Sequence, residues 1–135
     1  MGSPVDRLIV LDTHTWVWWA AELPGLSTSA RRELEQAARV GVCTISCWEL
    51  GLLVKRGSVD VEPDLRSWVA RALALDRVEE LPLTADIAVA AASLEEPFPR
   101  DPADRIIYST TTAHDALLLT KDRAIRRYAP SRTIW

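Results

Sequence analysis

Three short apolar runs alternate with helical patterns along this 135-residue chain. The runs are Leu8–Leu11, Val42–Ile45 and Ala116–Leu119, and the first and last contain no polar residue. Strands of this kind are typical of a parallel sheet whose two faces are covered by helices. The alternation of strands and helices with short links therefore predicts a three-layer α/β domain built on a central parallel sheet.

Proline and hydroxyl residues indicate where the other elements begin. Pro63 and Pro102 are expected to open helices, and Ser46 and Thr84 are expected to cap two more. Two weaker strands, over residues 78–83 and 133–135, bring the expected sheet to four to five strands. We expect helices over residues 14–20, 27–40, 46–57, 63–73, 85–94, 102–114 and 121–128.

Length and apolar content predict a single globular domain without membrane association. We assign residues 1–135 to a single domain, because 135 residues leave no room for a second core. The apolar runs are far shorter than the roughly 20 residues of a membrane span, so no membrane association is expected. Residues 1–7 hold no apolar signal-peptide core, which makes the cytoplasm the expected location. Cys43 and Cys47 lack neighbours at zinc-like spacing, and we interpret them as small buried side chains.

Charge is distributed unevenly along the chain. The net charge of −3 disfavours a polyanionic partner, but residues 97–135 alone carry 7 basic and 4 acidic side chains. If four carboxylates bind divalent metal, the remaining groups sum to +1. A nucleic-acid substrate is then electrostatically acceptable, although an ordinary solvated surface explains the basic segment equally well.

Acidic residues stand at the ends of two predicted strands. Asp12 follows the first strand directly, and Asp122 lies just past the Leu117–Thr120 segment. Ligands of parallel α/β sheets bind outside the carboxyl ends of the strands, so both residues are candidates for a site. Each taken alone also has an ordinary interpretation as a helix cap or as a charge at a helix N-terminus.

Asp101 and Asp104 lie at the start of one predicted helix. Asp101 precedes Pro102, which is the arrangement of an N-cap followed by a proline at the first helical position. We assign capping to Asp101 and ligand binding to Asp104, and the sequence leaves open whether Asp101 also contacts a metal.

Glu49 is predicted to lie on an apolar helix face, beside Ile45, Leu52 and Leu53. An unpaired buried carboxylate costs several kcal/mol, so Glu49 either pairs with a cation or keeps its head in water at the helix margin. Four carboxylates brought together would repel one another and raise their own pKa values unless a cation compensated them. An all-oxygen ligand set suits Mg²⁺ or Mn²⁺ better than zinc.

Four segments, in this order and spacing, resemble the PIN domain of VapC-like toxins. They are Leu11–His14, Ser46–Leu50, Arg100–Arg105 and Leu118–Asp122, and the resemblance extends from about residue 8 to the C-terminus. The chain departs from the usual pattern at Ser109–Thr112, where alanine is common, and at Ala103, where a bulky residue is common.

The resemblance implies a PIN-like three-layer fold and metal-dependent cleavage of RNA by a toxin of a toxin–antitoxin pair. It implies a catalytic Mg²⁺ or Mn²⁺ site, a cognate VapB-like antitoxin and a homodimer. Metal ligands and catalytic residues would be Asp12, Glu49, Asp104 and Asp122. Supporting or substrate-binding roles would fall to Thr13, Asp101, Thr120, Arg105, Lys121 and Arg123.

Other interpretations compete with this one. Leu11–Thr15 partly resembles the opening motif of haloacid dehalogenases, but His14 stands where that motif has its second aspartate. A degenerate PIN module that binds RNA or protein without cutting is the non-enzymatic alternative.

The aromatic residues near Asp12 also allow more than one interpretation. His14, in the first turn of its helix, is interpreted as a bystander rather than a substrate contact. Trp16, Trp48 and Trp68 are expected in the core, whereas Trp18 points away from Trp16 and is expected at an interface with an antitoxin or a second subunit.

Overall fold

The computed structural model describes residues 7–135 and contains one five-stranded, fully parallel sheet. The strand order is β3-β2-β1-β4-β5, with β1 at the centre and β3 at an edge as expected. The strands are β1 (Leu8–Leu11), β2 (Arg39–Cys43), β3 (Val78–Leu81), β4 (Leu117–Leu119) and β5 (Thr133–Ile134). The prediction of a three-layer α/β domain with four to five parallel strands is confirmed.

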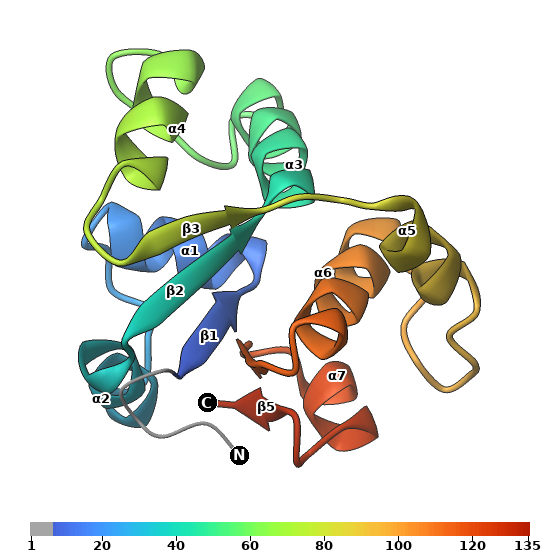
Figure 1. Cartoon of the computed structure of the whole chain (residues 1–135). Coiled ribbons are helices and arrows are strands. Elements are labelled where there is room, and N and C mark those ends of the chain that lie inside the picture. Colours follow the sequence, from blue (N-terminus) through green and yellow to red (C-terminus); the bar gives the residue numbers. More distant parts are fainter. Residues whose placement is uncertain (1–6) are drawn as a thin grey trace.

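Helices cover both faces of the sheet. In Figure 1, α1, α2 and α4 lie on one side of the strands and α5, α6 and α7 on the other. The helices are α1 (Thr13–Ala20), α2 (Thr28–Gln36), α3 (Thr44–Lys55), α4 (Leu65–Leu73), α5 (Ala85–Ala92), α6 (Pro102–Ala113) and α7 (Arg123–Tyr128). None of the helices in residues 7–135 is long and apolar enough to cross a membrane. The expectation about a signal peptide falls almost wholly on residues 1–6, outside the described part of the chain.

Alternate residues of β1 supply two separate cores. Ile9 and Leu11 belong to a cluster with Trp16 and Leu50, whereas Leu8 and Val10 belong to a second cluster on the opposite face. This second cluster includes buried side chains from the α6–α7 side of the sheet, among them Phe98, Ile107 and Ile125. The two-sided burial explains why β1 is apolar throughout.

The central connection differs from the sequence-based prediction. The helix expected over 27–40 ends at Gln36, and β2 begins at Arg39 rather than Val42. Pairing with both β1 and β3 outweighs the helical pattern of this segment. Position 41 of β2 is a glycine, and any side chain there would clash, because a Cβ would lie 2.6 Å from Leu81 Cδ1.

Helix starts are partly as expected. Ser27, Thr84 and Asp101 cap α2, α5 and α6 through their side chains. Ser46 does not cap α3, which begins at Thr44 with Cys43 in the N-cap position. The helix expected from Pro63 begins at Leu65 instead. Asp64 is its N-cap and accepts a hydrogen bond from the Ser67 N–H.

Trp48 is exposed, contrary to the prediction that it packs in the core. The buried face of α3 is set by Ser46 and Leu50, four residues apart, and position 48 lies on the opposite side of that helix. Trp16 is fully buried and packs edge-on against Trp68, with ring centroids 5.3 Å apart. The prediction is confirmed for Trp16, whereas Trp68 is only partly buried and packs against the core from its edge.

The threonine-rich turn of α6 is accommodated inside the helix. Thr110 and Thr111 are buried, and their hydroxyls donate to the carbonyls of Ile106 and Ile107, four residues earlier. Such internal hydrogen bonds satisfy the buried hydroxyls without a partner from another element. The departure from an alanine-rich helix therefore leaves α6 continuous.

Candidate active site

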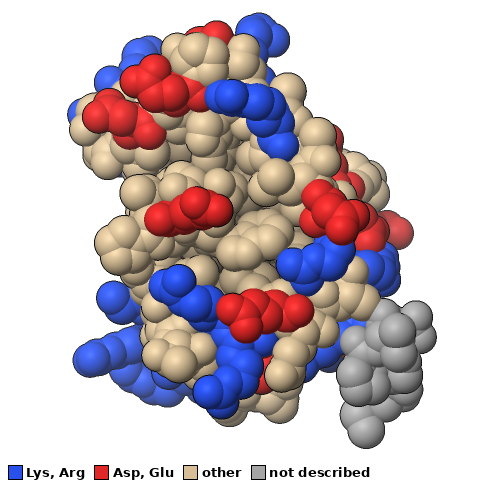
Figure 2. All heavy atoms as spheres, turned by 90° about the vertical axis from the view of Figure 1, so that its left-hand side faces the viewer, with Lys and Arg blue, Asp and Glu red and all other residues tan. Residues whose placement is uncertain are grey.

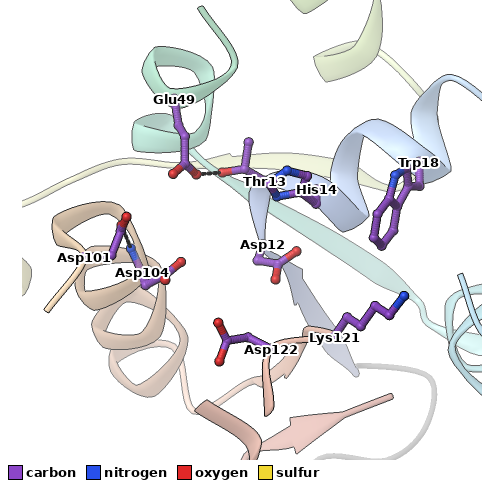
Figure 3. A pocket seen from close by; sticks show the side chains of 9 residues that line it. All are labelled: Asp12, Thr13, His14, Trp18, Glu49, Asp101, Asp104, Lys121 and Asp122. Carbon is purple, nitrogen blue, oxygen red and sulfur yellow. Dashed lines mark hydrogen bonds between the residues drawn. The ribbon is translucent and has the colours of Figure 1, made fainter. Parts of the chain in front are cut away.

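A pocket lies at the carboxyl ends of the neighbouring strands β1 and β4. Strand order changes direction between these two strands, which is the place where α/β sheets bind ligands. The pocket has a volume of about 340 Å³, and Figure 3 shows the side chains around it. It is lined by Asp12, Thr13, His14, Trp18, Glu49, Asp101, Asp104, Lys121 and Asp122.

Asp12 is positioned by the end of β1 and the start of α1. Its backbone N–H donates to the carbonyl of Leu119, and its carboxylate accepts from the Thr15 N–H at 3.0 Å and the Thr15 hydroxyl at 2.8 Å. A hydrogen bond from Thr120 also reaches the carboxylate. Burial raises the pKa of Asp12 above its ordinary value despite these hydrogen bonds, which lower it.

Glu49 is fixed by hydroxyl groups from α1 and α3. The Thr13 hydroxyl donates to the Glu49 carboxylate and lies 3.2 Å from the Ser46 hydroxyl, and both of these hydroxyl residues are buried. Because one hydroxyl has one hydrogen, Ser46 donates to Thr13 while Thr13 donates to Glu49. Glu49 thus points into the pocket from the apolar face predicted for it (Figure 3).

Asp104 lies in the first turn of α6, capped by Asp101. The Asp101 carboxylate accepts from the Asp104 N–H at 3.0 Å, so the predicted capping role of Asp101 is confirmed. Burial, together with the charges of Asp101, Glu49, Asp12 and Asp122, raises the pKa of Asp104 to about 7. The pocket therefore concentrates negative charge around Asp104.

Asp122 is the most open of the four predicted ligands. It is the N-cap of α7, where its carboxylate accepts from the Ile125 N–H at 3.0 Å. Its own N–H donates to the Thr120 hydroxyl at 3.1 Å. Thr120 is fully buried and so connects Asp122 with Asp12 from beneath the pocket.

The basic residues predicted to contact substrate separate into two groups. Lys121 lines the pocket, and Arg123 is exposed at the first position of α7. Arg105 lies elsewhere, with its guanidinium donating to the carbonyls of Pro99, Ala91 and Leu94. We therefore assign Arg105 to holding α5 and the following loop against α6, in place of the predicted phosphate contact.

The donor set of the pocket fits a hard divalent cation. Asp12, Glu49, Asp104 and Asp122 offer only oxygen ligands, and their mutual repulsion is relieved by added positive charge. Among residues 7–135, no three of these acidic side chains lie close enough together to hold a metal ion as they stand. The four carboxylates therefore share one pocket without forming a coordination shell, and the chemistry of the donors is what suits Mg²⁺ or Mn²⁺.

Sequence reasoning did not assign His14 and Trp18 to this pocket, and it also missed two residues that hold the site's side chains in place. Thr15 holds Asp12 through two hydrogen bonds and also donates to the Leu119 carbonyl, and Ser46 supports Thr13. The signal for Thr15 was its position three residues after Asp12, because the residue three positions after a helix N-cap commonly hydrogen-bonds to the cap side chain. No local pattern indicated that Ser46 would support Thr13, and the residue was interpreted as a helix cap instead.

The sequence model of the PIN domain family matches residues 9–130. The chain belongs to the PIN domain family. It is also 35% identical over 129 residues to Ribonuclease VapC22 of Mycobacterium tuberculosis, covering 94% of this chain and 98% of that protein.

Solved structures of toxin–antitoxin proteins share the fold. VapBC2 from Rickettsia felis, solved with a DNA fragment from its promoter, matches with a TM-score of 0.70 and 19% identity, covering 95% of this chain and 98% of that one. A toxin–antitoxin complex from Klebsiella pneumoniae matches with a TM-score of 0.66 and 17% identity, over 94% and 96% of the two chains. At these identities the matches establish the PIN architecture alone.

Proposed function

We propose that this chain is a metal-dependent endoribonuclease, the toxin of a VapBC-type toxin–antitoxin pair. The observation that carries the proposal is the single pocket shared by Asp12, Glu49, Asp104 and Asp122 in a PIN-family chain. A relative named as a ribonuclease, 35% identical over almost the whole chain, supports RNA as the substrate.

Each residue has a role that follows from its contacts. Asp12 and Asp104, with Glu49 and Asp122, would hold Mg²⁺ or Mn²⁺ through carboxylate oxygens. The bound ion supplies activation of a water molecule and neutralisation of charge on the attacked phosphate. Hydrogen bonds to these carboxylates from Thr13, Thr15 and Thr120 restrict their rotation, which keeps the oxygens available to the cation.

Basic side chains at the rim complete the substrate site. Lys121 lines the pocket and Arg123 is exposed at the start of α7, which supports the proposal that both bind phosphates flanking the cleaved bond. Figure 2 shows the two signs of charge interspersed over one face of the molecule, with Lys and Arg more frequent toward its lower part.

The proposed partners follow from the relatives. Related folds occur in VapBC2 and in another toxin–antitoxin complex, and we extend from them a VapB-like antitoxin to this chain. The homodimer is proposed from the family resemblance alone. An antitoxin arginine placed among the four carboxylates would compete with the metal and inhibit cleavage. The proposed place of action is the cytoplasm, without membrane attachment.

Cleavage of total RNA tests the proposal. Purified protein with Mg²⁺ or Mn²⁺ should produce discrete fragments, and EDTA should abolish them. Asp12→Asn should abolish cleavage and cellular toxicity but keep the fold, because asparagine caps a helix as well as aspartate does. Circular dichroism checks the fold, and metal-dependent cleavage retained by Asp12→Asn, or RNA binding without any cleavage by the wild type, contradicts the proposal.

A further inference from the structure

Trp18 occupies the wall between two hollows of the surface. It lines the acidic pocket together with Lys121, and it also lines a second hollow of about 420 Å³ beside Trp19, Leu26 and Arg31. Figure 3 shows its indole at the end of the pocket opposite Glu49 and Asp104. Unlike the fully buried Trp16, this ring is only partly buried and is not used by the core.

Gly25 supports one face of the Trp18 indole. A Cβ at Gly25 would lie 2.5 and 2.7 Å from Cδ2 and Cε2, the two atoms shared by the fused rings. Those atoms are approached this closely only from above the ring plane, so the Gly25 backbone lies flat against the indole. With φ of +147° the position is one that glycine adopts readily and other residues rarely do, so a glycine here lets the loop lie close to the ring.

The other neighbours of Trp18 leave it able to stack. His14 and Trp135 lie with ring centroids 6.0 and 6.3 Å away, but at tilts of 51° and 56°, so neither ring is stacked on the indole. The Lys121 ammonium lies 5.9 Å from the indole centroid, within the range of a cation–π contact. Because the Lys121 ammonium lies over the ring and Gly25 covers one ring face, a base that stacks on the indole would displace the ammonium, which could then bind the phosphate of the same nucleotide.

We propose that Trp18 and Lys121 form a nucleotide subsite, in which the indole stacks on a base and the ammonium binds the adjoining phosphate. This inference rests on the proposed function, because the subsite adjoins the carboxylates that would cut the strand. Base–aromatic stacking tolerates any base, so the subsite holds the strand in register without selecting a sequence. The second hollow, on the other side of Trp18, is lined by Arg31 and also by Glu22 and Glu35, so the subsite is confined to the end of the acidic pocket.

A nucleotide fits this end of the pocket better than an apolar partner side chain does. The acidic residues repel phosphate, and Lys121 is the cation among the residues that line the pocket, so a strand entering it has one favourable place for a phosphate. An apolar side chain of an antitoxin or of a second subunit would contact the indole but would offer no negative group to the exposed Lys121 ammonium. We therefore favour RNA over the protein interface predicted for Trp18 from sequence.

Binding of a labelled oligouridylate, measured by fluorescence anisotropy with Mg²⁺, tests the subsite independently of cleavage. The assay uses Asp104→Asn protein, which is predicted not to cut. Adding Trp18→Leu should weaken binding about tenfold, and Trp18→Tyr should restore most of the loss. An otherwise identical oligonucleotide without bases should bind equally to the proteins with and without the Trp18→Leu substitution, because no base remains to stack.

Steady-state cleavage by the otherwise wild-type protein gives the second measurement. Trp18→Leu should raise KM about tenfold and leave kcat within about twofold, since the residue binds substrate away from the reacting phosphate. Trp48→Leu removes an exposed tryptophan outside the pocket and should change neither value.

Several results would overturn the inference. They are unchanged oligouridylate binding by Trp18→Leu, an equal loss with the base-free oligonucleotide, or loss of antitoxin or self-association with RNA binding intact. If the wild type cuts no RNA, the proposed function fails, whereas the anisotropy comparison still decides whether Trp18 binds a base.

Discussion

The pocket has an acidic end and an aromatic end, and the two are held together by different forces. At the acidic end, Asp12 and Glu49 are fixed by hydrogen bonds from hydroxyl and N–H donors of neighbouring residues. At the aromatic end, Trp18 is fixed by van der Waals contact with the Gly25 backbone and by tilted contacts with two other rings.

Only the acidic end is under electrostatic strain. Burial raises the pKa of Asp12, and burial with like charges raises that of Asp104, so the ionised forms needed to bind metal are destabilised in the metal-free protein. Trp18 gains contact area and needs no counterion. A bound cation should therefore stabilise the acidic end of the pocket and leave the aromatic end unchanged.

The largest expected effect is on kcat at the acidic end. Asp104→Asn should lower kcat at least about 100-fold, more than the roughly 10–100-fold typical of residues that merely orient a ligand. Trp18→Leu should change mainly KM in the same assay. Steady-state cleavage of one RNA by both variants makes the measurement, and the contrast between the ends collapses if Asp104→Asn affects only KM.

A smaller effect is expected at the hydroxyl that holds Glu49. Thr13→Val preserves the shape of the side chain but removes the donor, and should weaken Mn²⁺ binding and kcat by about tenfold. Thr13→Ser keeps the hydroxyl and serves as the matched control. Equal losses in the valine and serine variants would show that packing rather than the hydrogen bond is responsible.

The stability of the metal-free protein should depend on pH through Asp104. Its pKa is about 7 in the folded chain against an ordinary value of 3.8. Below about pH 4 the carboxyl is protonated in both folded and unfolded chains and has no effect on stability. Between about pH 4 and 7 only the unfolded chain has released the proton, so stability falls as pH rises, and above about pH 7 the full loss remains.

Asp104→Asn isolates this contribution. In EDTA the variant should be more stable than the wild type by about 1–3 kcal/mol at about pH 7.5, a range reduced for partial solvent exposure. The difference should disappear near pH 4. Urea unfolding at both pH values measures it, and a pH-independent difference would mean that the raised pKa does not reflect a penalty for the buried charge.

The smallest effect belongs to the lysine at the aromatic end. Lys121→Gln should raise KM about threefold and reduce the slope of log KM against log salt by about one, because one phosphate contact is lost. Metal affinity should not fall. A salt slope identical to that of the wild type would remove Lys121 from the substrate path.

Sequence reasoning predicted the architecture and the acidic residues because both depend on local signals. Asp12 and Asp122 follow apolar runs whose burial identifies them as strands, and parallel strands bring their carboxyl ends to one edge. Asp101 was recognisable as a cap from the proline after it.

The errors occur where contacts distant in sequence decide the structure. The predicted helix over residues 27–40 ends early, because the segment from Arg39 pairs with two strands. Trp48 is exposed because Ser46 and Leu50 form the buried face of α3. Arg105 stands beside Asp104 in sequence, yet its long side chain reaches backbone carbonyls of the α5 segment. No local pattern reports where such a side chain ends.

Mn²⁺ binding at about pH 7.5, followed by electron paramagnetic resonance, tests the central claim most directly. The wild type and Trp18→Leu should bind Mn²⁺ with the same affinity, and Asp104→Asn should bind at least about tenfold more weakly. Absence of Mn²⁺ binding by the wild type, or unchanged binding by Asp104→Asn, would contradict the assignment of this pocket as a metal-dependent nuclease site.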